Sequence, residues 1–268
     1  MTPPRTLRRA AVPVGLAIAS VLAAGCGDDG GGGGGGAIGP FAPSVDTVRI
    51  EIDYETGEAP YTGSVLGFGD TFDLTIANLD RLFAGTRTVE VPTTIAAMED
   101  IGAVADEELT TADLLALADA HRGVTDGGGV KSYYVVFVSG TFADADGAQP
   151  SVLGVSIGDT GVIAMFKDVI ASTGSTAFPN LARFVEQSTL IHELGHGFGL
   201  VDNGVATTSA HVDTAHGKHC TNDACVMYWL NEGASDAAMF ARQYVTSGNA
   251  ILFGDECLAD VDALTGGP

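Results

Sequence analysis

Residues 181–199 read LARFVEQSTLIHELGHGFG, and this stretch decides how the rest of the chain must be arranged. Its apolar residues recur at helical spacing as far as HELGH, which predicts a helix. His192 and His196 lie one turn apart, so both imidazoles project from the same face of that helix. Two neutral imidazoles on one face suit Zn²⁺, and Glu193 between them can polarise a water molecule. The stretch therefore predicts a zinc site rather than two surface histidines.

The helix is expected to end at Gly197 and Gly199, because glycine is poor inside a helix and favours the turn that follows it. The next thirty residues are rich in side chains that bind metals. Five of the six histidines and the only tryptophan lie between 192 and 229. A catalytic zinc needs three protein ligands, so this region offers more candidates than the metal requires.

Four residues are candidates for the third ligand: Asp202, His211, His216 and His219. Asp202 would need only a short turn after the helix, and carboxylate is an acceptable zinc ligand. His219 would need a loop of about eighteen residues to return to the metal, which costs little additional closure entropy. The residues alone leave this choice open.

HELGHGFG fits the pattern HExxHxxG, and CVMYW places Met227 after a loop. This combination resembles the metzincin clan of zinc peptidases. The resemblance covers Thr47 to Leu264 in layout, but only residues 192–229 in motif. It implies a mixed sheet above the active-site helix, an antiparallel edge strand that binds substrate, and a methionine turn beneath the metal. The strands between Val152 and Phe166 would form that edge.

HCTNDACVM fits H-C-x4-C-x-M and closely resembles the archaemetzincin subfamily, in which the third histidine directly precedes the first cysteine. The resemblance favours His219 as the third ligand, with Asp202 as the alternative, and makes residues 201–218 an insertion. It also suggests a role for Tyr228 at the metal or the tetrahedral oxyanion. A core position beside Trp229 is the other interpretation of this tyrosine.

The subfamily binds a structural zinc with four cysteines. Here only Cys257 lies in the region of the last two, so a site of four thiols is excluded. The chain carries the features of an exported protein, in which disulfides are permitted. We therefore predict a disulfide between Cys220 and Cys225, with Cys257 as a buried thiol or as the replacement for one partner.

The N-terminus has arginines, then an apolar run, then LAAGC, which resembles a bacterial lipobox. Leu22 lies four residues before Cys26 instead of the usual three. We predict a lipoprotein signal peptide over 1–25, lipidation of Cys26, and a glycine-rich tether over 26–45. A plain signal peptide cleaved near Ala24 is the alternative. The domain would occupy 46–268, with one subdomain to about 199 and a loop-rich one over 200–268.

The composition sets the class of protein and its partners. A chain of 268 residues that is 46% hydrophobic can bury a proper core. Its net charge of −22 repels nucleic acid and anionic lipid, which argues against both as partners. Contact with a membrane would then depend on the lipid on Cys26. Oligomeric state is left open.

The order of the predicted elements indicates an α/β fold with a mixed sheet. Strands are expected over 47–54, 88–92 and 131–139, and over 152–157 and 161–166, which form either two strands or one strand interrupted around Gly158-Asp159. Helices are expected over 71–83, 110–122, 236–244 and 256–264, and a further helix opens at Pro179-Asn180 and ends at Gly197 and Gly199.

The expected function is that of a membrane-tethered zinc endopeptidase exported from the cytoplasm, with one catalytic Zn²⁺ and Glu193 as general base. The alternative is a non-catalytic surface lipoprotein that binds or captures metal.

Overall fold

The computed structural model describes residues 39–176, 178 and 180–267. Its central sheet has six strands, in the order β10-β11-β7-β1-β4, with β5 also paired to β1. Every pair in this sheet is parallel except β10 with β11, which is antiparallel. The predicted mixed α/β fold with an antiparallel edge strand is thus confirmed. The strands are β1 (Thr47–Tyr54), β4 (Thr88–Glu90), β5 (Glu99–Asp100), β7 (Val130–Val138), β10 (Gly154–Ile157) and β11 (Val162–Phe166).

Strand β7 is the middle of this sheet, as its sequence KSYYVVFVS predicts. It pairs with β1 over eight positions and with β11 over five. The side chains from Lys131 to Val138 are all buried, which is the expected state of a parallel strand covered on both faces.

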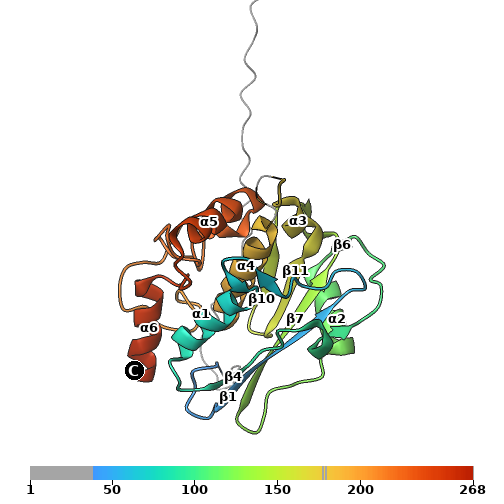
Figure 1. The fold of residues 1–268 in the computed structure, drawn as a ribbon. Helices are drawn as coiled ribbons and strands as arrows, with labels where there is room; N and C mark the ends of the chain where they lie inside the picture. The colour runs from blue at the N-terminus through green and yellow to red at the C-terminus, as the bar shows by residue number, and fades with distance from the viewer. Residues whose placement is uncertain (1–38, 177, 179, 268) are drawn as a thin grey trace, which may run out of the picture.

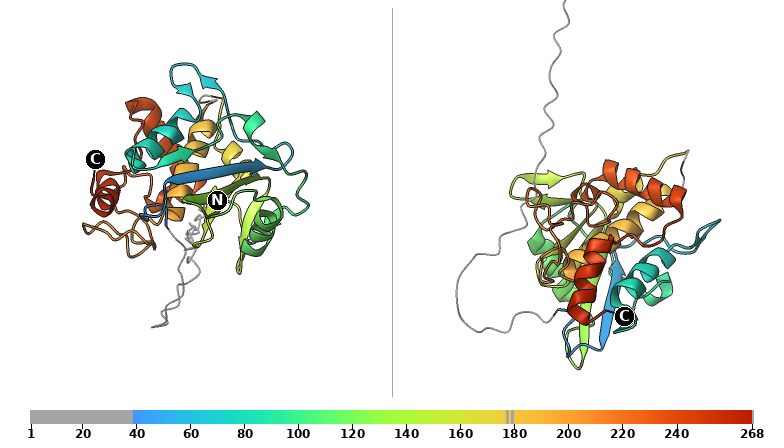
Figure 2. Two further views of the ribbon diagram at one scale, coloured as in Figure 1. Left: turned by 90° about the horizontal axis from the view of Figure 1, so that it is seen from below. Right: turned by 90° about the vertical axis from the view of Figure 1, so that its left-hand side faces the viewer.

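Helices cover both faces of the sheet (Figures 1 and 2). Helix α2 lies on one face, whereas α1 and α4 lie on the other. Helices α5 and α6 follow the loop-rich segment after α4 and lie beside α4 and α1. The helices are α1 (Asp73–Phe83), α2 (Thr111–His121), α3 (Lys167–Ser172), α4 (Leu181–Gly197), α5 (Ala234–Ser247) and α6 (Asp255–Thr265).

Helix α4 is enclosed on nearly all sides. Every residue from Phe184 to Gly195 is buried, including polar ones. Among these, Glu186 forms a buried ion pair with Lys167 and accepts a hydrogen bond of 2.7 Å from the backbone nitrogen of Tyr61. The helix that carries HELGH is therefore fixed within the core.

The structure adds short elements that periodicity did not indicate. Helix α3 was not predicted, because its six residues are too few to show a helical repeat. The remaining elements are β2 (Ser64–Val65), β3 (Gly69–Asp70), β6 (Glu108–Leu109), β8 (Thr141–Asp144), β9 (Gly147–Gln149) and the 3-10 turns η1 (Ile95–Ala97) and η2 (Trp229–Glu232).

The predicted signal peptide, the lipidated Cys26 and most of the tether lie outside the described residues. Within the described part of the chain, none of the helices combines the length and the apolar character needed to span a bilayer.

Candidate metal centre

Helix α4 presents His192 and His196 on one face, as the sequence predicted. His192 is fully buried, and its Nδ1 lies 2.6 Å from the backbone oxygen of Val226. A carbonyl oxygen can only accept, so Nδ1 carries the hydrogen and Nε2 keeps a lone pair. That Nε2 lies 3.1 Å from Nε2 of His196.

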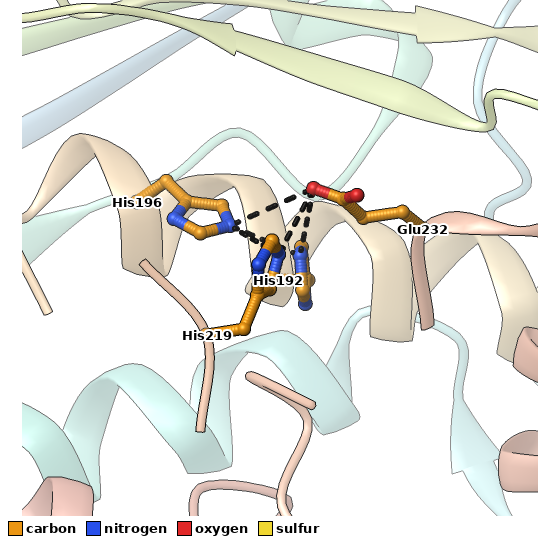
Figure 3. Close-up of side chains that lie close together, drawn as sticks. All are labelled: His192, His196, His219 and Glu232. Atoms are coloured by element: carbon orange, nitrogen blue, oxygen red, sulfur yellow. Dashed lines mark hydrogen bonds and ion pairs between the residues drawn. The ribbon is translucent and has the colours of Figure 1, made fainter. Parts of the chain in front are cut away.

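His219 reaches the same point from the loop that follows α4 (Figure 3). Its Nε2 lies 3.2 Å from Nε2 of His196. Its Nδ1 lies 2.7 Å from the backbone oxygen of His216 and carries a hydrogen, so Nε2 is the nitrogen that faces the other two rings. The structure thus brings together His192, His196 and His219.

These three nitrogens fit a zinc ion. Burial, reinforced by the rings of His192 and His219, holds the pKa of His196 well below its ordinary value, so the group is neutral. Imidazole nitrogens that face one another at these distances favour a cation between them. Nitrogens that bind one zinc at about 2.0 Å in a tetrahedron lie about 3.3 Å apart. The two spacings of 3.1 and 3.2 Å agree with this value.

The loop between α4 and His219 folds back on itself. Val212 pairs with Cys220 in an antiparallel bridge, and Asp213 donates its backbone hydrogen to the oxygen of His219 over 2.7 Å. Asp202, the alternative third ligand, lies near the start of this loop with a side chain 60% exposed. It contacts Lys218 and is outside the group of candidate ligands that contains the three histidines.

The two other histidines of the loop have different partners. The ring of His216 stacks on Trp229, with centroids 3.8 Å apart, and its Nδ1 lies 2.7 Å from a carboxylate oxygen of Asp213. His211 is buried in a second cluster, described below. Neither belongs to the group formed by His192, His196 and His219.

Met227 lies directly against helix α4. It is fully buried, and a Cβ atom added at Gly195 would lie 2.4 Å from its sulfur. The helix ends at Gly197. Gly199 follows with a φ of 88°, which suits glycine, and Leu200 donates a backbone hydrogen bond of 3.0 Å to the oxygen of Gly195. The rings of Tyr228 and Trp229 have centroids 6.2 Å apart. A role for Tyr228 at the metal stays a prediction.

Glu193 points from the same helix toward β10. It is 2% exposed, and a Cβ atom added at Gly154 of β10 would lie 3.0 Å from its Cγ. Among the described residues, its Oε1 has no hydrogen-bond partner. Burial, together with the charge of Glu232, raises the pKa of Glu193 well above its ordinary value. A raised pKa makes this carboxylate a stronger base near neutral pH.

Glu232 is a member of the site that sequence reasoning missed. One of its carboxylate oxygens lies 2.9 Å from Nε2 of His219, 3.9 Å from that of His192 and 4.0 Å from that of His196 (Figure 3). Glu232 lies five residues after Met227, outside the motifs used to find the other ligands. Only the fold shows that it belongs to the site.

A second cluster of metal-binding side chains overturns the predicted disulfide. Cys220, Cys225 and Cys257 are all buried and carry thiols, so the disulfide predicted between Cys220 and Cys225 is absent. Cys225 Sγ lies 3.7 Å from Cys257 Sγ, and Cys220 Sγ lies 3.4 Å from Nδ1 of His211. Counting thiols alone missed this arrangement, because the loop adds an imidazole to the three thiols.

The ligand atoms of His211, Cys220 and Cys257 lie within 4.8 Å of one another, and Cys225 lies beside this group through its contact with Cys257. Three thiolates and one imidazole form a common closed zinc site. The far nitrogen of His211, Nε2, lies 2.7 Å from a carboxylate oxygen of Asp260, which is itself 1% exposed. A carboxylate in this position fixes the ring and raises its basicity toward a metal. The chain can therefore hold metal at two neighbouring places.

The sequence matches no protein-family model and no curated protein. Several solved structures are similar to it in fold, among them three zinc peptidases. An archaemetzincin from Methanopyrus kandleri shares 15% identity at a TM-score of 0.45, over 84% of this chain and 97% of that one. A zinc-dependent peptidase from Methanocorpusculum labreanum shares 14% identity at a TM-score of 0.42, over 79% of this chain and 99% of that one. An archaemetzincin from Archaeoglobus fulgidus, complexed with malonate, shares 14% identity at a TM-score of 0.40, over 79% of this chain and 99% of that one. At these identities the similarity concerns the fold alone.

Proposed function

We propose that the protein is a zinc-dependent endopeptidase. The observation that carries this proposal is the convergence of three imidazole Nε2 atoms beside Glu193. His192, His196 and His219 would hold the ion. When bound, zinc lowers the pKa of a water molecule and polarises a carbonyl oxygen.

The remaining chemistry belongs to Glu193. Its carboxylate takes a proton from the attacking water as the water oxygen bonds to the peptide carbonyl carbon. The same group then passes that proton to the amine as the C–N bond breaks. Burial raises the pKa of Glu193, which allows its carboxyl group to hold the proton between the two steps.

Strand β10 supports a peptide as substrate. It is the edge of the central sheet and lies over Glu193. Its far side pairs with none of the described strands, so an extended peptide can add there through backbone hydrogen bonds. This would place a scissile bond next to the site without a deep side-chain pocket.

Replacement of Glu193 tests the mechanism. In the purified, zinc-loaded protein, Glu193→Gln should leave zinc bound and reduce cleavage of an unstructured protein substrate by at least about 10²-fold, because proton transfer by a positioned side chain contributes that much. Asp202→Asn is the matched control and should retain activity. Full cleavage by the Glu193→Gln protein would show that this mechanism is wrong.

The N-terminal sequence supports a tether to the membrane. The basic start, the apolar run and LAAGC before the glycine-rich stretch are the basis for this part of the proposal. A Cys26→Ser protein expressed in a bacterium should move from the membrane fraction to a soluble one, because it lacks the acceptor for lipid. If Cys26→Ser stays with the membrane as the unaltered protein does, lipidation of this cysteine is not what holds it.

A non-catalytic zinc-binding protein is the second candidate. One observation favours it: the carboxylate of Glu232 lies where a catalytic zinc would keep an open position. Zinc bound without any peptide cleavage would support this alternative.

A further inference from the structure

Glu232 stands at the corner that the three histidines leave open. Its nearest oxygen and the three Nε2 atoms all lie within 4.8 Å of one another. The distances from this oxygen to the nitrogens of His219, His192 and His196 are 2.9, 3.9 and 4.0 Å. These values bracket the spacing of about 3.3 Å between ligands of one tetrahedral zinc. The carboxylate is therefore placed as a fourth ligand.

The chain holds Glu232 there from both sides. On one side, Met227 is packed against α4 and its oxygen accepts a backbone hydrogen bond of 2.8 Å from Cys220. On the other side, Gly233 pairs with Val152 in an antiparallel bridge, two residues before β10 begins. Glu232 thus lies between the turn beneath the helix and the approach to the edge strand.

The carboxylate is nevertheless on the solvent side of the site. Its side chain is 40% exposed, whereas those of His192 and His219 are 0% and 8% exposed. Rotation of the side chain can carry the oxygen into water without disturbing the core. His192 and His219 have less freedom, because their side chains are buried and form hydrogen bonds to backbone oxygens.

Four permanent ligands would make the site a closed, structural one. Yet Glu193 is buried beside the ligands with a free carboxylate oxygen among the described residues, an arrangement that a structural site does not need. We propose that Glu232 is a displaceable fourth metal ligand, which closes the site at rest and is exchanged for water or a substrate carbonyl oxygen. This inference rests on the proposed peptidase function.

The backbone segment that binds substrate adjoins the one that positions Glu232, so peptide binding and displacement of Glu232 would be coupled. A peptide added along β10 runs toward the bridge between Val152 and Gly233, which adjoins Glu232. Occupation of the edge strand therefore acts on the segment that positions the fourth ligand.

The test compares the full-length protein with Glu232→Gln and with Asp202→Asn, which alters an exposed carboxylate outside the ligand group. Cobalt replaces zinc, and the visible spectrum is followed as azide is added. Glu232→Gln should bind azide at concentrations at least about tenfold lower than the other two proteins, because a coordination position has been opened. It should also release one of its zinc ions to a chelator more readily.

Equal azide binding by all three proteins would overturn the assignment. A Glu232→Gln protein that retains zinc but no longer cleaves peptides would also overturn the assignment. In that case Glu232 would be required for the reaction instead of blocking the metal. If none of the proteins cleaves peptides but the difference in azide binding is observed, the fourth ligand stands and the peptidase proposal fails. Faster cleavage by Glu232→Gln, with the azide difference, supports both.

Discussion

At the scale of single residues, Gly195 shows how tightly the metal site is built. It lies between the two helical ligands, and the absence of a side chain allows the sulfur of Met227 to approach the helix backbone. The turn that contains Met227 in turn supports Val226, whose oxygen fixes the ring of His192. The lack of a Cβ at position 195 therefore allows the close packing of the turn on the helix, and this packing helps to orient His192.

Gly195→Ala should destabilise the protein by about 1–3 kcal/mol, the usual cost of forcing extra volume into a packed core. The reason is the 2.4 Å separation between the added Cβ and Met227. Gly197→Ala, in the same helix, meets its nearest atom only at 3.4 Å and should leave the stability unchanged or increase it by less than about 1 kcal/mol. Denaturant unfolding of both variants measures the difference. A Gly195→Ala protein as stable as Gly197→Ala would contradict the packing described.

At the scale of elements, the loop after α4 and helix α6 are joined by the second cluster. Helix α6 supplies Cys257 and Asp260, whereas the loop supplies His211 and the two cysteines that precede Met227. Because Cys220 directly follows His219, the same backbone serves both clusters. A metal held by the thiols would therefore also keep the third histidine in place.

Metal analysis of the purified protein should accordingly find two zinc ions per chain under reducing conditions. Cys257→Ala should lower this to about one, since three of four ligands bind a structural zinc poorly. Glu193→Gln is the control and should retain two. One zinc in the unaltered protein, with a disulfide among the cysteines, would show that the cluster does not bind metal.

The elements differ in how far the sequence predicts them. Strands such as β1 and β7 and the helix α4 follow from apolar periodicity, because each is long enough to show it. The same helix brings His192 and His196 together by spacing alone. His211 and Glu232 belong to sites that only tertiary folding assembles, from residues with no fixed spacing in sequence. The cluster of histidines indicated His211 only as a candidate for the catalytic metal, and no local pattern indicated Glu232.

At the scale of the whole molecule, charge is the dominant feature. Thirty-four acidic residues stand against twelve basic ones, which gives the net charge of −22. Repulsion among like charges destabilises the compact state, since folding brings them closer together. The proposed lipid tether would hold this negative domain near a surface that it does not bind by charge.

The thermal midpoint of unfolding should therefore rise when salt is added to the purified protein. Increasing NaCl from about 0.01 M to about 0.15 M shortens the screening length from about 30 Å to about 8 Å, which weakens the repulsion. A neutral solute at equal osmolarity controls for effects other than charge. A midpoint that stays constant or falls with salt would show that local ion pairs outweigh the overall repulsion.

The enclosure of α4 divides the metal site into a rigid half and a deformable half. Two ligands and the base stand on a helix that the core immobilises, while the third histidine and Glu232 come from segments outside it. Loss of metal would first loosen the loop around His219 and leave the helix intact. Amide exchange in residues 201–220 would then report how much of a preparation is metallated, without any substrate.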